Sequence, residues 1–427
     1  MERNEFRNSI LECDLSALKT EDNSSLIKSE FNRRIRIKDC DIPNAICMQP
    51  MESSGSLPDG SPDQITQKKY ERFAKSGAGL IWYEAIAVSD EARSTKKHLL
   101  INDSTVPAFK AHLNTVKSIS QEAIGGESAL LIAQLTHNGR LSKNNKKVIA
   151  CHNEFFDFQA KIPNDYPVLT DDELEKIEDS FVEAALSAEK AGFHGVDIKA
   201  CHCYLISELL SCYEREGRYG GDFEGRTRFL FNVIDRIREK AGEQFIITTR
   251  ICVTDGFPGS WGWTGKGYSD VDLEETKRLI DLLQSKGIDL INLSMGKRAY
   301  TKDLESNEII VSEEKPIDWF WRILHYTKQL KLHNKDVTIV GTGYSVINEL
   351  APLVAAICMN KGYVDIAGFG RQSLAYPGFV QDILFKGSLE KRSCCKVCDK
   401  CLLLLRAGLD VGCTQYDPYY ADLFNSL

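Results

Sequence analysis

Three side chains that could do chemistry lie within six positions of one another, at the end of the short apolar run HGVDIK (residues 194–199). Lys199 offers a cation, His202 an imidazole that titrates near neutral pH, and Tyr204 a weakly acidic phenol. Polar groups of different acidity at the end of a predicted β-strand could bind and protonate a substrate, so we predict an enzyme site here. The plainer interpretations are a strand-end lysine paired with a nearby acid, a structural loop histidine and a packed tyrosine.

Polar or glycine-rich segments also follow most of the other apolar runs. They are Gln49-Pro50-Met51-Glu52, Tyr83-Glu84-Ala85, Gln134 with His137-Asn138-Gly139-Arg140, Arg250, Gly341-Thr342-Gly343 and Gly368-Phe369-Gly370-Arg371. The last two turns suit a phosphate, because exposed backbone N–H groups can approach it closely. Each turn alone is weak support, since glycine is also common in tight turns without a ligand, but together they favour phosphate.

Eight apolar runs alternate with segments of helical spacing and predict strands that are buried on both faces. The runs are residues 44–50, 79–85, 128–135, 194–199, 245–251, 289–294, 337–342 and 364–369, and examples of helical spacing are residues 64–76, 171–191, 272–286 and 345–361. Eight such strands, each followed by a helix, predict an α/β fold of the (β/α)8 TIM-barrel type, with chemistry at the carboxyl ends of the strands. A doubly wound sheet is the alternative, but its early glycine-rich dinucleotide turn is missing.

The predicted barrel divides the chain into three parts. We expect an N-terminal extension at residues 1–30, the barrel at residues 31–390 and a short cysteine-rich extension at residues 391–427. In the last part, Cys395, Cys398, Cys401 and Cys413 have the spacing of four thiolate ligands, which predicts an iron–sulfur cluster or zinc, with metal-free thiols as the alternative. The scattered cysteines are expected to be buried thiols rather than disulfides.

Bulk properties exclude several classes of protein. A net charge of −8 argues against binding to nucleic acid, and no apolar run approaches the length of a membrane span. The charged N-terminus lacks the apolar core of a secretory signal, so we expect a cytoplasmic protein, which could form oligomers.

The motifs resemble those of the old yellow enzyme family, flavin-dependent ene reductases built on a barrel that holds FMN. The resemblance covers roughly residues 31–385. It is carried by the Gln-Pro-Met start, by Gln134 with the His137–Arg140 segment, by the strand from Gly195 with Tyr204-Leu205, by Tyr219-Gly220-Gly221 with Glu224 and Arg226, and by Gly370-Arg371.

The resemblance implies roles for individual residues. Pro50, Met51 and Ala85 would contact the isoalloxazine through their backbone, with Glu52 also near the flavin. Gln134 would bond the pyrimidine edge and Arg250 would stabilise negative charge on the reduced flavin. Thr342, Gly343, Gly370 and Arg371 would hold the phosphate.

The resemblance also implies a reaction. After reduction by NAD(P)H, the flavin would reduce the alkene of an α,β-unsaturated carbonyl or carboxylate, with Tyr204 as the proton donor. Lys199 and His202 stand where the family commonly has a His-His or His-Asn pair that polarises the substrate oxygen. Lys199 is a departure, and as a cation it makes a carboxylate or a strongly polarised enone a plausible target. The sequence suggests no partner for Glu52.

The cysteine tail is similar to that of the 2,4-dienoyl-CoA reductase and trimethylamine dehydrogenase branch, which carries a 4Fe–4S cluster and continues into FAD- and nicotinamide-binding domains. No GxGxxG turn of such domains is found in this chain. Two alternatives to the ene reductase therefore stay open. One is a dehydrogenase subunit that passes electrons through the cluster to a protein partner, and the other is a non-catalytic barrel with a zinc-bound interaction tail.

Overall fold

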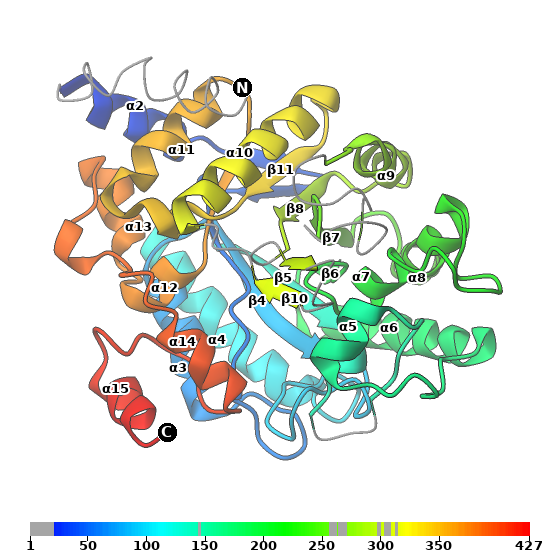
Figure 1. Ribbon diagram of the computed structural model, residues 1–427. Helices are drawn as coiled ribbons and strands as arrows, with labels where there is room; N and C mark the ends of the chain where they lie inside the picture. Colours follow the sequence, from blue (N-terminus) through cyan, green and yellow to red (C-terminus); the bar gives the residue numbers. More distant parts are fainter. Residues whose placement is uncertain are drawn as a thin grey trace.

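The computed structural model describes residues 21–143, 147–255, 263, 271–296, 300–302, 309–311 and 315–427. Eight parallel strands close into a barrel, and helices surround it (Figure 1). In their order around the barrel the strands are β11 (Thr338–Gly341), β12 (Ile366–Phe369), β3 (Ile46–Met48), β4 (Leu80–Ala87), β5 (Leu130–Thr136), β6 (Gly195–Ile198), β7 (Ile246–Cys252) and β8 (Leu290–Ser294). The predicted (β/α)8 barrel and its eight strands are confirmed.

The helices alternate with these strands. They are α2 (Glu21–Phe31), α3 (Gln64–Lys75), α4 (Val106–Ile124), α5 (Glu154–Ala160), α6 (Asp171–Ala191), α7 (Leu205–Leu209), α8 (Phe223–Ala241), α9 (Glu274–Ser285), α10 (Pro316–His333), α11 (Ala351–Asn360), α12 (Arg371–Ala375), α13 (Phe379–Gln381), α14 (Lys400–Arg406) and α15 (Pro418–Asn425). Short 3-10 or π-helical segments are η1 (Gly139–Leu141), η2 (Tyr344–Leu350), η3 (Asp382–Lys386) and η4 (Lys391–Ser393), and two small hairpins are β1 (Ile35–Ile37) with β2 (Cys40–Ile42) and β9 (Tyr300–Lys302) with β10 (Ile309–Val311).

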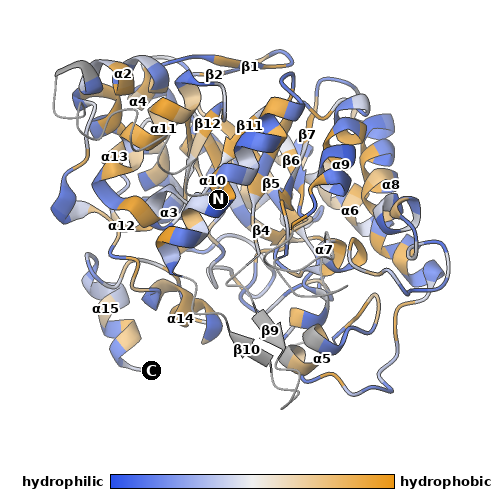
Figure 2. Ribbon diagram, turned by 45° about the horizontal axis from the view of Figure 1, so that its top comes forward, coloured by the Kyte–Doolittle hydropathy of each residue, from blue (hydrophilic) through white to orange (hydrophobic). Residues whose placement is uncertain are grey.

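Apolar side chains fill the inside of the barrel. Residues at the amino ends of the strands, such as Leu80, Leu130 and Leu290, pack there with Ile37 and Ile42 of the β1–β2 hairpin. The hairpin thus covers the amino end of the barrel and leaves the carboxyl ends for the site. Around the barrel, the helices carry hydrophobic residues on part of their surface and hydrophilic residues on the rest (Figure 2), as expected where one face packs on the strands.

Local helix signals are confirmed at α6. The Thr170 side chain accepts a hydrogen bond from the backbone N–H of Glu173, and the Glu173 carboxylate accepts one in return from the Thr170 backbone N–H. Gly192 ends the helix with a φ of 102°. These reciprocal bonds satisfy backbone groups that an uncapped helix end leaves unpaired.

The single helix predicted at residues 345–361 is wrong. Asn348, inside the segment η2, has φ 51° and ψ −124°, a non-helical conformation that kinks the chain before α11 begins at Ala351. Pro352 in the first turn of α11 suits the start of a new helix. The apolar residues on either side continue across the break, which is why their spacing suggests one helix.

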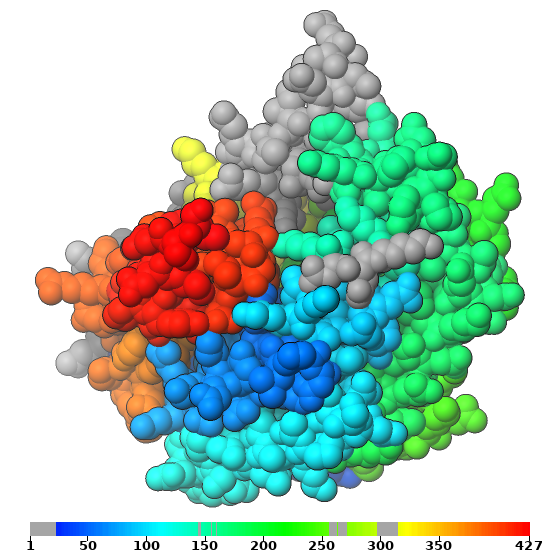
Figure 3. Space-filling view, turned by 90° about the horizontal axis from the view of Figure 1, so that it is seen from below, coloured from blue at the N-terminus to red at the C-terminus, as the bar shows by residue number. Residues whose placement is uncertain are grey.

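Both end segments pack on the barrel. Helix α2 lies against α11 and η3, with Ile27 and Phe31 buried. The C-terminal segment, orange to red in Figure 3, lies beside the blue segment that includes α3, where Arg72 pairs with Asp417 at 3.4 Å. In the described part of the chain, none of the helices combines the length and the apolar character needed to cross a bilayer.

Candidate active site

Glu52, Lys199 and Tyr204 meet at the carboxyl end of the barrel, and we call them the Glu52 cluster. Tyr204 Oη donates a hydrogen bond of 2.7 Å to Glu52 Oε2. Lys199 Nζ lies 3.6 Å from the same oxygen and 3.3 Å from the centroid of the Tyr204 ring. The Lys199 and Glu52 side chains are only 4% and 12% exposed, so water screens the pair weakly. The structure thus supplies the partners of Glu52 that the sequence did not reveal.

The charges of the Glu52 cluster follow from burial and from these contacts. Burial by itself would raise the pKa of Glu52, but the nearby Lys199 ammonium and the hydrogen bond from Tyr204 bring that pKa below its ordinary value. Burial lowers the pKa of Lys199, and Glu52 opposes this shift. Burial and the Glu52 charge both raise the pKa of Tyr204. At neutral pH the carboxylate is therefore ionised and the phenol keeps its proton.

His98 supports the segment next to the Glu52 cluster. Its Nδ1 accepts a hydrogen bond from the backbone N–H of Ser94 at 3.1 Å, so its Nε2 carries the proton and donates to the Ala85 carbonyl oxygen at 2.9 Å. Burial lowers the pKa of His98 and keeps the ring neutral. The Ser94 hydroxyl also lies 3.4 Å from Glu52 Oε1. His98 lies in a loop without sequence pattern, and no local signal would have identified it.

His202 lies with a different group of partners. Its Nε2 is 2.7 Å from the Ser294 hydroxyl at the end of β8, and Arg250 Nη2 reaches the same hydroxyl at 3.5 Å. The two residues of the predicted pair therefore have different partners: Lys199 contacts Glu52, and His202 contacts Ser294. Both His202 and Cys203 have φ values of 61°, a conformation that is uncommon outside glycine and turns the chain sharply after β6.

A buried carboxylate organises the residues predicted to contact a flavin ring. Asp197 accepts hydrogen bonds from Gln134 Nε2 (2.6 Å), Trp82 Nε1 (2.8 Å) and the backbone N–H of Arg250 (2.6 Å). Burial raises the pKa of Asp197 to about 6, although these bonds oppose the shift. Because Gln134 donates through its amide nitrogen, its carbonyl oxygen remains as the acceptor for a ligand N–H. An acid inside the apolar run GVDI was the available sequence signal for Asp197.

Two further polar residues that the sequence analysis missed lie on β8. The Asn292 amide exchanges hydrogen bonds with the Gln49 amide, at 2.8 and 3.2 Å. Ser294 joins His202 to Arg250 as described above. Both interrupt the apolar run at residues 289–294, a signal that could have pointed to the carboxyl end of this strand.

The barrel mouth also presents hydrogen-bond donors that suit an anionic, acceptor-rich group. Among the described residues, Arg250 Nε and Gln372 Nε2 are buried and have no hydrogen-bond partner. Gly343 has a φ of 95°, which a residue with a side chain rarely adopts. A Cβ on Gly370 would come within 2.9 Å of Met51 Sδ, so glycine allows the turn after β12 to approach the segment after β3. These features fit FMN at the predicted residues.

The other predicted flavin residues lie as follows. Pro50 is buried and Met51 half-buried after β3, and Thr342 is half-buried after β11. The Ala85 carbonyl oxygen is the acceptor for His98. Arg371 Nη1 lies 2.6 Å from Asp399 Oδ1, so the predicted phosphate arginine is in contact with the cysteine-rich segment.

The predicted metal-binding cysteines all lie in the segment that follows η4. In the described parts of the chain, no group of three or more His, Cys, Asp or Glu side chains is placed so that it could hold a metal ion. The thiols do affect one another, because Cys398 contributes to raising the pKa of Cys395, Cys401 and Cys413, for which burial is the larger cause. The metal site therefore stays a prediction.

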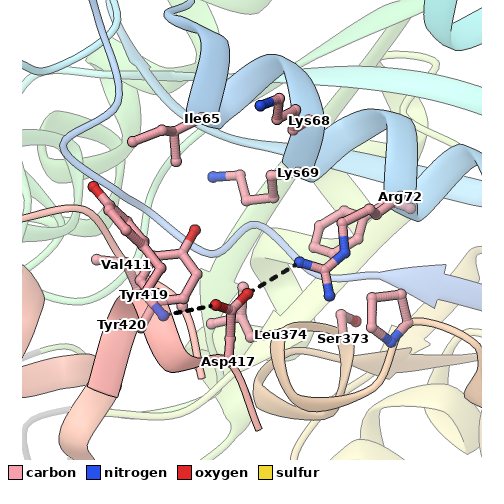
Figure 4. Close-up of a pocket in the computed structure, with 13 residues that line it drawn as sticks. Ile65, Lys68, Lys69, Arg72, Ser373, Leu374, Val411, Asp417, Tyr419 and Tyr420 are labelled. Atoms are coloured by element: carbon pink, nitrogen blue, oxygen red, sulfur yellow. Dashed lines mark hydrogen bonds and ion pairs between the residues drawn. The ribbon is translucent and has the colours of Figure 1, made fainter. Parts of the chain in front are cut away.

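A buried ion pair anchors the segment that carries Glu52. Glu84 on β4 pairs with Lys69 of α3, and its Oε2 accepts hydrogen bonds from the Ser53 backbone N–H (2.6 Å) and hydroxyl (2.7 Å). Lys69 also lines a cavity of about 340 Å³ between α3 and the C-terminal segment (Figure 4). Lysine, arginine and tyrosine side chains line this cavity, but none of the predicted catalytic residues does.

The loops after β5 and β6 are fastened together beside the site. Arg140 contacts Glu208 through Nε at 2.7 Å and Nη2 at 2.8 Å, and it also pairs with Asp157. Cys151 and Cys212 form a disulfide between the same loops, so the expectation that the chain lacks disulfides is wrong. Scattered cysteine positions did not reveal that the fold brings these two thiols together. Cys47, Cys252 and Cys358, in contrast, are buried free thiols as predicted, whereas Cys40, expected to be buried too, is free but half-buried.

The sequence is similar to a family of flavin oxidoreductases and to individual members of known activity. Residues 33–387 match the NADH:flavin oxidoreductase / NADH oxidase family. A NADH oxidase of Thermoanaerobacter brockii is 28% identical over 349 residues, which cover 80% of this chain and 48% of that protein. A NADPH dehydrogenase of Bacillus pumilus (strain SAFR-032) is 32% identical over 265 residues, 61% of this chain and 71% of that protein. The chain thus spans about half the length of the first relative.

Solved structures share the fold. A 2-naphthoyl-CoA reductase in complex with 2-naphthoyl-CoA superposes with a TM-score of 0.75 at 19% identity, over 93% of this chain and 58% of that one. The old yellow enzyme homologue from Zymomonas mobilis gives a TM-score of 0.62 at 23% identity, over 85% of this chain and 94% of that one.

Proposed function

Because the chain belongs to the NADH:flavin oxidoreductase / NADH oxidase family, we propose that it is an FMN-dependent ene reductase that acts on α,β-unsaturated carbonyl compounds. The observation that carries this proposal is the Tyr204 phenol, held in a buried site between a carboxylate and an ammonium group. A protonated phenol is a suitable acid for the carbon that receives a proton in alkene reduction.

The cofactor would lie across the carboxyl ends of the strands. A bound FMN would supply the two electrons that alkene reduction needs. Backbone groups of Pro50, Met51 and Ala85 would line its ring, and Gln134 would accept from its imide N–H. The Arg250 guanidinium, with its buried and unpartnered Nε, would face the part of the ring that becomes negative on reduction.

The phosphate would lie at the turns after β11 and β12. Thr342 and Gly343 would hold it from one turn, and Gly370 and Arg371 from the other. NAD(P)H is the proposed electron donor, in keeping with the names of the related NADH oxidase and NADPH dehydrogenases.

The charge of the Glu52 cluster narrows the substrate class. Lys199 alone would attract a substrate carboxylate, but Glu52 offsets that charge at 3.6 Å. A carboxylate entering this site would also meet the Glu52 carboxylate, and like charges in a weakly screened site repel. We therefore favour a neutral carbonyl, such as a ketone or thioester, with Lys199 and His202 as its hydrogen-bond donors. The neighbouring structure that holds 2-naphthoyl-CoA has a thioester ligand, which is in keeping with this class.

Two half-reactions test the proposal. The protein loaded with FMN should be reduced by NAD(P)H and reoxidised under anaerobic conditions by an enone, and more slowly by the matching unsaturated acid. Tyr204→Phe should leave flavin reduction unchanged and slow reoxidation about 10²–10⁴-fold, the usual contribution of a general acid. Stopped-flow flavin absorbance measures both steps. Failure of the wild-type protein to bind FMN or to transfer electrons to any alkene would reject the function, and equal reoxidation of both proteins would reject Tyr204 as the acid.

A second candidate is a flavin dehydrogenase subunit that passes electrons to a partner protein. The spacing of Cys395, Cys398, Cys401 and Cys413 favours this alternative, and the Arg371–Asp399 contact would bring a centre held by these cysteines near the proposed phosphate site. No step of the proposed alkene reduction is routed through such a centre. The non-catalytic zinc-bound barrel is not favoured, because the family match indicates a flavin-dependent oxidoreductase.

A further inference from the structure

Glu52 lies in the segment between β3 and α3 and accepts the hydrogen bond of the Tyr204 phenol. This contact bears on how Tyr204 regains its proton between turnovers. If Tyr204 protonates the substrate, as in the proposed function on which this inference rests, it becomes a phenolate and must regain a proton before the next cycle. We propose that Glu52 is the relay residue that passes this proton from solvent to Tyr204.

The two oxygens of Glu52 face different surroundings. Oε2 accepts the 2.7 Å hydrogen bond from Tyr204 and lies 3.6 Å from Lys199 Nζ. Oε1 faces the hydroxyl of Ser94 at 3.4 Å, and Ser94 is half-buried on the loop after β4. One carboxylate thus spans the distance between the catalytic phenol and a partly exposed loop. A proton taken up by Glu52 has Tyr204 as its hydrogen-bonded neighbour.

The change in charge drives the transfer. When Tyr204 gives its proton to the substrate carbon, the phenolic O–H bond breaks and a C–H bond forms, so a phenolate lies beside the Glu52 carboxylate. Two adjacent anions in a buried site repel each other and strengthen the affinity of the pair for a proton. Glu52 takes up a proton from solvent, its O–H bond breaks as the Tyr204 O–H bond reforms, and the carboxylate is restored. Lys199, over the ring, stabilises the phenolate in the interval.

Other titratable groups around Tyr204 are less suited to this transfer. Lys199 Nζ lies over the ring face rather than at the phenolic oxygen. Both ring nitrogens of His98 are engaged, with Ser94 and Ala85. Cys201 and Cys203 lie near enough to raise the pKa of Tyr204, and burial raises the pKa of the Cys201 thiol to about 12. Glu52 is therefore the titratable group that both contacts the phenolic oxygen of Tyr204 and carries a negative charge.

Single and repeated turnovers separate a relay from a proton donor. In one turnover of pre-reduced, FMN-loaded protein with an enone, Tyr204 still carries its own proton, so the single-turnover rate gives the effect of Glu52→Gln on the chemical step alone. In steady state the rate of the same variant relative to wild type should be at least tenfold lower than in the single turnover, with the deficit growing as pH rises, because protons become scarcer. Glu52→Asp should restore part of the turnover. Tyr204→Phe should be slow in both experiments.

A matched control removes a different carboxylate that holds the same segment. Glu84→Gln disturbs the anchoring of Ser53 but does not touch Tyr204. It should leave the ratio of single-turnover to steady-state rates, and the pH profile, as in wild type. If Glu84→Gln and Glu52→Gln change that ratio alike, the effect is structural and the relay is rejected. A Glu52→Gln variant with wild-type steady-state turnover at every pH also rejects it.

A titration without turnover tests the coupling between Glu52 and Tyr204 independently of alkene reduction. Spectroscopic titration of tyrosine, taken as the difference from Tyr204→Phe, should show that Glu52→Gln lowers the pKa of Tyr204 by about 1–3 pH units, since a neighbouring negative charge is gone. An unchanged titration rejects the coupling. If the wild-type protein reduces no alkene but the titration shifts, the proposed function fails while the coupling stands.

Discussion

At the scale of the residue, the buried carboxyl of Asp197 predicts a pH dependence of stability that does not depend on the substrate. Its pKa is raised from an ordinary value of 3.8 to about 6, with burial as the main cause. The folded protein therefore binds more protons than the unfolded chain between these two values, so the free energy of unfolding falls as pH rises through this window. Asp197 is then an ionised, buried acid above pH 6, at a cost on the order of 2–3 kcal/mol.

Asp197→Asn should remove that dependence. We expect the free energy of unfolding of the variant to be flatter than that of wild type between about pH 4 and pH 6, the window that the raised pKa defines. Urea denaturation at several pH values measures the difference between the two proteins. A parallel pair of curves would show that Asp197 titrates at its ordinary pKa. Because asparagine has one acceptor oxygen where Asp197 uses two, either the Arg250 backbone N–H or the Gln134 amide loses its partner, and the variant should also release FMN more readily.

The Glu52 cluster shows at the same scale what residue type alone leaves undecided. A lysine at a strand end predicted either a substrate anchor or a structural ion pair, and the 3.6 Å contact with Glu52 places it in an ion pair within the site. Because Lys199 also lies over the Tyr204 ring, the ion pair and the proposed proton donor form one unit. The residue types were found from the sequence, but their charge state depends on these contacts.

At the scale of the element, the loops after β5 and β6 depend on Arg140. Arg140→Met should destabilise the protein by about 3–5 kcal/mol, because it leaves the buried carboxylates of Glu208 and Asp157 without their cation. Arg36→Met is the matched control, since its ion pair with Asp41, whose side chains are exposed on the β1–β2 hairpin, should contribute less than about 1 kcal/mol. Urea denaturation measures both variants. Equal losses of stability in the two variants would mean that burial does not increase the contribution of the Arg140 ion pairs.

Helix boundaries show how far local patterns reach. The start of α6 was predictable because Thr170 and the acids after it form a capping box within one turn. The break at Asn348 was not, because the apolar spacing of residues 345–361 continues through it. In the fold η2 contacts α10 and β12, whereas α11 contacts α2, and these neighbours are not encoded in the local spacing.

At the scale of the whole molecule, the metal content of the tail tests whether the chain carries a second redox centre. Protein purified without oxygen should contain about four iron and four sulfide per chain, the composition of a 4Fe–4S cluster, and Cys398→Ser should lose them. Iron, zinc and sulfide analysis measures this content. Stoichiometric zinc would support the alternative site, and neither metal in freshly purified protein would leave the cysteines as free thiols. Cys394→Ser is the control, because Cys394 lies outside the predicted ligand spacing.

The match to the flavin oxidoreductase family confirms the resemblance on which the FMN assignment rests. It covers the barrel from residue 33 to residue 387 and stops before the cysteine tail. The tail nevertheless packs on the barrel, and Arg72–Asp417 and Arg371–Asp399 are two of its polar contacts. A change in the tail can therefore reach the predicted phosphate site through Arg371.

The sequence by itself determined the barrel and the strand ends at which its chemistry lies. Strands covered on both faces appear as continuous apolar runs, and helix caps are encoded within a few residues, so both signals are local. Tertiary structure alone decided which side chains meet. Glu52 and Tyr204 are 152 residues apart, and Cys151 and Cys212 are 61 apart. Closure of the barrel brings them together, and no local spacing encodes contacts between different strand ends.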